Sequence, residues 1–135
     1  MDPFVYQSLP LQVVFGEGTS ARLAEEADLL AVRRALILTT PGHERLGREM
    51  GERLGDRFAG LFAGAVMHTP VGVTGEALRR AADLRADGVV AVGGGSTVGL
   101  GKAIALRTGL PQIAIPTTLR HTAKSLPQRC FQRRP

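Results

Sequence analysis

The sequence predicts an α/β fold with a doubly wound parallel sheet, formed by residues 1–118 of a 135-residue chain. Two observations lead to this class. Several short apolar runs are continuous rather than alternating, which is typical of strands buried on both faces. Helical patterns lie between these runs with short connections, so the strands should pair in parallel through right-handed crossovers.

The strands are expected in short stretches that are largely apolar, and residues 35–38 and 89–92 are apolar throughout. There are five such stretches, at residues 11–15, 35–38, 61–67, 89–92 and 112–115. Most of them end at glycine, proline or threonine, residues that are common at turns.

Helical spacing of apolar residues fills the intervals between the strands. The first helix should begin at a cap formed by Thr19 or Ser20, and the second should span residues 43–54. The third is expected to start at a Thr74 cap. The fourth should span residues 97–107.

The net charge of +5 is confined to residues 119–135, because residues 1–118 carry equal numbers of acidic and basic side chains. We therefore divide the chain into one domain, residues 1–118, and a divergent basic tail, residues 119–135, which is expected to be disordered. A nucleic-acid surface would combine basic and aromatic side chains on a folded face, but the tail has only Phe131. Nucleic acid is not an expected partner.

Composition also bears on the cellular setting. Apolar residues make up 44% of the chain, yet no uncharged apolar run is long enough to span a bilayer, and no secretory signal pattern is present. The single Cys130 offers no disulfide framework. We expect a cytoplasmic protein without a membrane partner.

The most informative segment follows the strand at residues 89–92: three glycines and a serine, Gly93, Gly94, Gly95 and Ser96, precede a helical pattern. A helix N-terminus presents unpaired N–H groups and the positive end of the helix dipole, and glycines let an anion approach the backbone. Residues 39–41 and 116–118 end two other strands. In a parallel sheet all three segments should meet at one edge, where ligands bind.

Two well-known phosphate-loop patterns do not fit this segment. A Walker loop would need glycine at Ser96 and a hydroxyl at Ala103, so nucleotide hydrolysis is not expected. The standard dinucleotide pattern would need glycine or alanine at Val98. The loop is therefore a variant phosphate site.

Three separated segments resemble the iron-containing alcohol dehydrogenase superfamily: residues 13–18, 91–96 and 114–118. Within it, residues 65–71 and 95–106 are similar to the maleylacetate reductases. Alcohol dehydrogenase members usually carry aspartate three residues beyond the loop serine. This chain has Gly99 there, as the reductases do.

The resemblance implies that residues 1–118 form a Rossmann-like dinucleotide-binding domain whose cofactor is NADH or NADPH. By motif match, Gly93, Gly94, Gly95 and Ser96 would cradle the pyrophosphate, and Thr117 and Thr118 would bind the cofactor's phosphate or nicotinamide side. Thr40 stands where the family often has a ribose-binding aspartate. A neutral hydroxyl does not repel a 2′-phosphate, so both cofactors should bind.

The resemblance further implies a reaction and an assembly. The reductases convert maleylacetate to 3-oxoadipate in the breakdown of aromatic compounds, and the family is expected to form homodimers. The family's all-helical second domain supplies the substrate pocket and, where a metal is used, its ligands.

After Thr118 the chain departs from the family and turns rich in arginine and glutamine. A frameshift in a GC-rich gene is our expectation for this departure. The all-helical domain is then lacking, apolar surface is left exposed, and the fragment should be inactive, with a small-molecule substrate only in a full-length relative. We assign no catalytic and no metal-binding residues, since His43 and His68 have no second ligand at metal spacing.

Three other functions stay open. The chain could derive from an alcohol dehydrogenase of the same superfamily, or it could be a non-catalytic dinucleotide-binding module. A nucleic-acid-associated protein acting through the basic tail is the third. Its binding would depend steeply on salt and would be lost without residues 119–135.

Overall fold

A computed structural model describes residues 11–13, 23–67 and 70–116. Within them, five strands form one sheet in the order β1-β5-β4-β2-β3, and every neighbouring pair is parallel. The strands are β1 (Leu11–Val13), β2 (Ala35–Leu38), β3 (Phe58–Phe62), β4 (Gly88–Gly93) and β5 (Gln112–Pro116). The parallel α/β fold expected from the sequence is confirmed.

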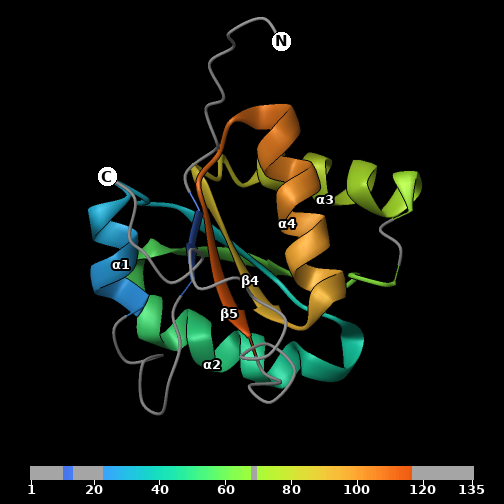
Figure 1. Ribbon diagram of the computed structural model, residues 1–135. Helices are drawn as coiled ribbons and strands as arrows, with labels where there is room; N and C mark the ends of the chain where they lie inside the picture. The colour runs from blue at the N-terminus through green and yellow to red at the C-terminus, as the bar shows by residue number, and fades with distance from the viewer. Residues whose placement is uncertain (1–10, 14–22, 68–69, 117–135) are drawn as a thin grey trace, which may run out of the picture.

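Helices cover both faces of the sheet (Figure 1). One face packs against α1 (Leu23–Leu29) and α2 (Glu44–Leu54), and the other against α3 (Val71–Asp83) and α4 (Gly95–Thr108). Two short 3₁₀ helices, η2 (Pro41–His43) and η3 (Gly55–Arg57), flank α2. From β2 the chain crosses to β3 over one face and returns to β4 over the other. The sheet is therefore doubly wound.

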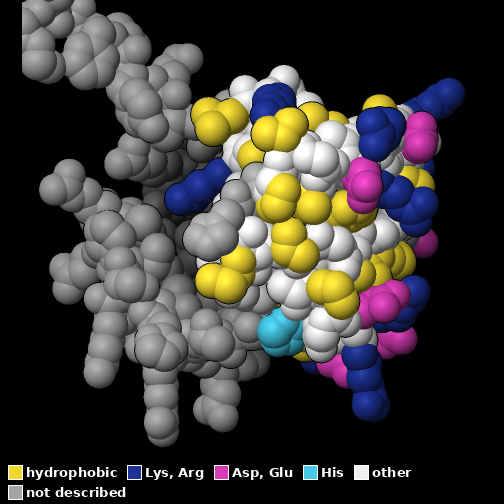
Figure 2. Space-filling model, turned by 90° about the vertical axis from the view of Figure 1, so that its right-hand side faces the viewer, with side chains coloured by type: hydrophobic (Ala, Val, Ile, Leu, Met, Phe, Trp, Pro, Cys, Tyr) yellow, Lys and Arg dark blue, Asp and Glu magenta, His cyan; other side chains and the backbone are white. Residues whose placement is uncertain are grey.

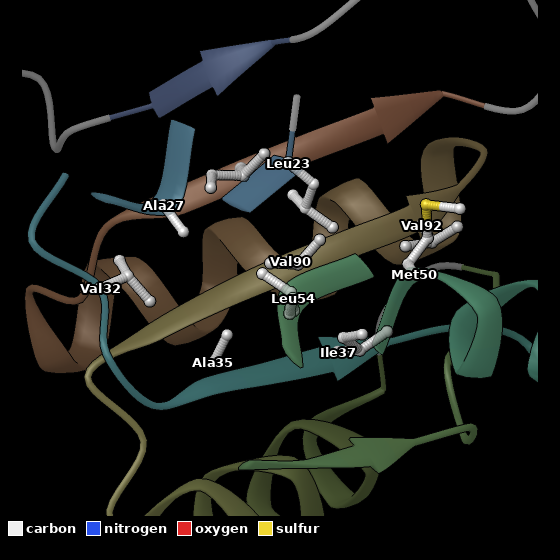
Figure 3. Close-up of a cluster of buried hydrophobic side chains, with 10 residues drawn as sticks. Leu23, Ala27, Val32, Ala35, Ile37, Met50, Leu54, Val90 and Val92 are labelled. Carbon is white, nitrogen blue, oxygen red and sulfur yellow. The ribbon is translucent and has the colours of Figure 1, made fainter. Parts of the chain in front are cut away.

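The sheet separates two hydrophobic cores. Ile37 lies in the core under α1 and α2, which also contains Leu23, Met50, Leu54, Val90 and Val92 (Figure 3). Leu36 and Leu38 lie in the core under α3 and α4, with Ala77, Val89, Leu100 and Ile104. Successive side chains of β2 thus enter different cores, because they point to opposite faces of a strand. Burying one such leucine or isoleucine stabilises the folded state by about 1.5–3 kcal/mol. A polar residue on either face of β2 would lose this contribution, and β2 has none.

The third strand lies earlier in the chain than residues 61–67, where the sequence predicted it. β3 begins at Phe58 and ends at Phe62, opposite the last residue of β2, Leu38. The prediction was wrong because it followed an apolar run beyond this partner strand. Val66 and Met67, at the end of that run, are 42% and 73% exposed.

Two helices begin before the threonines that the sequence predicted as their starts. Thr74 lies inside α3, and its hydroxyl donates to the carbonyl of Pro70 at 3.3 Å, so it does not cap the helix. α4 begins at Gly95 instead of Thr97. The second helix was predicted at residues 43–54, and α2 matches it to within one residue. Thr19 and Ser20 lie outside the described residues.

The face formed by α3 and α4 carries exposed hydrophobic side chains (Figure 2). Val71, at the start of α3, and Leu106, in α4, are each 78% exposed. Among the described residues, no helix is long and apolar enough to cross a membrane.

Candidate phosphate-binding site

The carboxyl ends of β2 and β4 lie side by side in the sheet. Leu38 pairs with Ala91, so Thr39 and Thr40 follow β2 at the level where β4 reaches Gly93. From β2 the chain leads to β3 on one side, and from β4 it leads to β5 on the other. In open α/β sheets, ligands bind where strand connections diverge in this way.

The loop between β4 and α4 is shaped by Gly93. Its φ of +142° is a conformation that residues with a side chain rarely adopt. A Cβ atom at Gly93 would also lie 2.9 Å from the hydroxyl oxygen of Thr97. At Gly94 and Gly95, by contrast, an added Cβ would meet nothing within 4 Å. The backbone is closely packed at its first glycine and open at the next two.

The side chain of Thr97 stabilises the first turn of α4. This residue is fully buried, and its hydroxyl donates to the carbonyl of Gly94 at 2.8 Å. The amide of Val98 donates to the same carbonyl at 3.2 Å. Among the described residues, no side chain caps the helix at Gly94. The first amides of α4 and the positive end of its dipole are therefore suited to an anionic ligand.

Thr40 stands on the neighbouring strand end, as predicted, and it has a partner that the sequence analysis did not assign. Its Oγ1 lies 2.9 Å from Nδ1 of His43, and the His43 amide donates to the Thr40 carbonyl at 3.0 Å. Both contacts arise because Pro41 and Gly42 form the single turn of η2. The Thr-Pro-Gly-His spacing was the available signal, since one 3₁₀ turn brings residues i and i+3 together.

Thr39 lies in the strand-end segment of residues 39–41 that the sequence predicted at the ligand edge, but it was assigned no binding role. It is fully buried, and its Oγ1 has no hydrogen-bond partner among the described residues. Its methyl group lies under α2, where a Cβ on Gly47 would approach it to 2.5 Å. Gly47, which weakens α2 by propensity, thus lets that helix lie close to the end of β2.

Thr117 and Thr118, two of the predicted cofactor-binding residues, lie outside the described residues. The strand before them does reach the same edge, since Pro116 of β5 pairs with Gly93 of β4. Their role stays a prediction. Of the predicted site residues, the structure places Thr40, Gly93, Gly94, Gly95 and Ser96 at neighbouring strand ends.

A metal centre does not fit the described part of the chain. Within residues 11–13, 23–67 and 70–116, no group of three or more histidine, cysteine, aspartate or glutamate side chains could hold a metal ion. His43, whose ring contacts Thr40, is not part of such a group.

The sheet order and the glycine loop define a doubly wound α/β protein in which one helix start, without a side-chain cap among the described residues, follows a glycine loop. Residues 10–123 match the family model for iron-containing alcohol dehydrogenases, and the chain belongs to this family. It is 52% identical over 118 residues to a maleylacetate reductase of Rhizobium sp., covering 87% of this chain. It is 45% identical over 115 residues to the Pseudomonas knackmussii maleylacetate reductase, covering 85% of this chain.

A solved structure gives the same relationship in three dimensions. The maleylacetate reductase of Agrobacterium tumefaciens superposes with a TM-score of 0.77 at 52% identity, over 87% of this chain and 34% of that protein. The shares of the Rhizobium and Pseudomonas relatives that are covered are 34% and 33%. The chain thus spans about a third of the length of the relatives that it matches.

Proposed function

We propose that this chain is the dinucleotide-binding part of a maleylacetate reductase, which uses NADH or NADPH to reduce maleylacetate to 3-oxoadipate in aromatic compound catabolism. The observation that carries the proposal is the 52% identity to the Rhizobium maleylacetate reductase, in a segment that includes the glycine loop. A cytoplasmic location and homodimer formation follow from the same relationship as further proposals.

The pyrophosphate would bind at the loop from Gly93 to Ser96. The open space at Gly94 and Gly95, the absence of a capping side chain among the described residues, and the dipole of α4 support this assignment. Thr40 would hydrogen-bond the adenosine ribose from the adjacent strand end. Thr117 and Thr118 would contact the phosphate or the nicotinamide side.

When bound, the cofactor would supply the hydride for reduction of the carbon–carbon double bond. The described residues would bind and orient it. Hydride transfer also needs a substrate held close to the nicotinamide in a site that excludes water. We propose that the sequence beyond the matched third of the relatives builds that site, so these 135 residues bind cofactor without turnover.

A pair of matched glycine variants tests the site. Gly94→Leu adds a side chain that meets no protein atom near its Cβ but fills the space in front of the loop. Gly72→Leu does the same in the first turn of α3, where an added Cβ also meets nothing within 4 Å. We expect NADH affinity, measured by fluorescence titration, to fall about tenfold or more in the first variant and to stay unchanged in the second. Equal affinities in two folded variants would contradict the assignment.

A hybrid enzyme tests the reaction. Residues 1–118 replace the matched region of the Rhizobium reductase, and NADH oxidation is followed with maleylacetate as substrate. We expect the hybrid to retain activity within about a hundredfold of the parent, because a displaced cofactor costs up to that much. A folded hybrid that binds NADH without reducing maleylacetate would favour a non-catalytic dinucleotide-binding module.

A further inference from the structure

We propose that the Thr40–His43 pair selects between NADH and NADPH according to the protonation state of His43, an inference that rests on the proposed dinucleotide site. The pair follows β2 directly, at the level of Gly93 on the adjacent strand. Thr40 Oγ1 and His43 Nδ1 are 2.9 Å apart, and the histidine is exposed. A ligand that reaches Thr40 therefore meets a hydroxyl whose hydrogen bonding depends on a titratable ring.

The neutral ring allows Thr40 to act as an acceptor toward the ligand. Neutral imidazole carries its hydrogen on one of two nitrogens. In the tautomer with Nδ1 free, the Thr40 hydroxyl donates to His43, and its oxygen keeps lone pairs for a donor from outside. The ribose 2′-hydroxyl of NADH is such a donor. The fully ionised 2′-phosphate of NADPH has only acceptors and cannot replace it.

Protonation removes that tautomer. Both ring nitrogens of a charged histidine are donors, so Nδ1–H donates to Thr40 Oγ1 and the hydroxyl hydrogen is released. It can then donate to a phosphate oxygen. The exposed imidazolium adds a positive charge near the same phosphate, and hydrogen bonds that involve charged groups are the stronger ones. Both changes favour NADPH relative to NADH.

In the described part of the chain, His43 is the titratable side chain in contact with Thr40. On α2, Glu44 is held by Arg48 at 2.9 Å and Arg45 lies 4.0 Å from Glu49. The packed strands β2 and β3 carry no titratable side chain. Besides η2, which contains His43 itself, α1 and η3 also contact α2: α1 carries Glu25, Glu26 and Asp28, and η3 carries Asp56 and Arg57. Arg57 pairs with Asp28 at 2.9 Å, and η3 follows the end of α2 remote from His43.

The sign of the pH dependence follows from these states. Histidine side chains change charge between about pH 5 and 8, so lowering the pH across this range should shift preference toward NADPH. The 2′-phosphate itself gains a proton below about pH 6 and loses charge, which weakens NADPH binding. Protonation of histidine can be distinguished from protonation of the 2′-phosphate between about pH 6 and 8, because the phosphate keeps most of its charge in this range.

The experiment measures the Kd of NADH and of NADPH for the full 135-residue chain at pH 6, 7 and 8 by cofactor fluorescence. We expect the ratio of the NADPH Kd to the NADH Kd to fall about tenfold from pH 8 to pH 6. In His43→Gln, a neutral side chain that can still bond Thr40, the ratio should stay within about twofold. In Thr40→Val, which keeps the histidine charge alone, the fall should be about threefold.

The 2′-phosphate of NADPH titrates in the same way with the wild-type chain, His43→Gln and Thr40→Val. The difference in the pH dependence of the Kd ratio between the wild-type chain and His43→Gln therefore measures the contribution of the histidine. The same pH dependence in both would overturn the selection by His43 and leave the dinucleotide site standing. Failure of the folded chain to bind either cofactor would overturn the proposed site, and this inference with it. Circular dichroism checks folding, and His43→Asn serves as a second neutral variant.

Discussion

The starts of α3 and α4 lie on the same face of the sheet, each following the carboxyl end of a strand, yet they differ as anion sites. Among the described residues, neither helix start has a side-chain cap. α3 follows Pro70 and the edge strand β3, and its first residue, Val71, is 78% exposed. α4 follows Gly93 and the inner strand β4. Both helix starts therefore offer free backbone amides. They differ because α4 follows a glycine loop next to the end of β2, and α3 does not.

The largest contrast is expected between alanine substitutions at the two starts. Gly93→Ala places a side chain at φ +142°, 2.9 Å from the Thr97 hydroxyl, and should lower the unfolding free energy by about 1–3 kcal/mol. Gly72→Ala adds a helix-favouring residue in open space and should raise it by about 0.5–1 kcal/mol. Urea unfolding measures both. If Gly93→Ala raised the unfolding free energy instead, the positive φ and the close packing against Thr97 would be contradicted.

A smaller contrast is expected between the two buried threonines. Thr97→Val removes the 2.8 Å hydrogen bond to the Gly94 carbonyl and should cost about 1 kcal/mol of stability. Thr74→Val removes a longer bond, 3.3 Å, to the Pro70 carbonyl, and should cost about 0.5 kcal/mol. Cofactor titration adds a second readout, in which only the Thr97 variant should lose NADH affinity. Loss of affinity in both would point to a general effect on stability.

The smallest effect on stability is expected from an added charge at the second residue of each helix. Ser96→Asp and Gly72→Asp each place a carboxylate at the positive end of a helix dipole, which stabilises by about 0.3–1 kcal/mol. At Ser96 the same charge should repel the pyrophosphate and lower NADH affinity about tenfold. At Gly72 the affinity should not change. Unchanged NADH binding in a folded Ser96→Asp chain would place the pyrophosphate elsewhere.

The sequence predicted the inner strands β2 and β4 well and the edge strand β3 poorly, and the two outcomes have the same physical reason. β2 and β4 are buried on both faces, so they appear as uninterrupted apolar runs with sharp ends. β3 is half-buried throughout and contains Gly60, and the apolar run that continues past it ends at the exposed Met67. Hydrophobicity alone could not separate this strand from the loop that follows.

The sequence likewise predicted some parts of the candidate site and missed others. Gly93 to Ser96 could be assigned because strand, glycines and helix follow one another directly in the chain. The sequence predicts a cap at Thr74 because a threonine whose hydroxyl bonds back to the preceding turn cannot be told from a capping threonine by its sequence position alone. The contact between Thr40 and His43 depends on the single turn of η2, for which the Thr-Pro-Gly-His spacing was the one sequence signal.

Thr39 has a consequence for the exchange of amide hydrogens with solvent. Its amide donates to the Phe62 carbonyl at 2.9 Å, and its carbonyl accepts the amide of Ala65 at 3.1 Å. Ala65 lies outside any strand, yet it is 1% exposed and is bonded to a residue that is fully buried. In deuterated water its hydrogen should exchange as slowly as those of β3, because both are released only when the sheet opens. A loop amide would thus report on the opening of the sheet beside the proposed cofactor site.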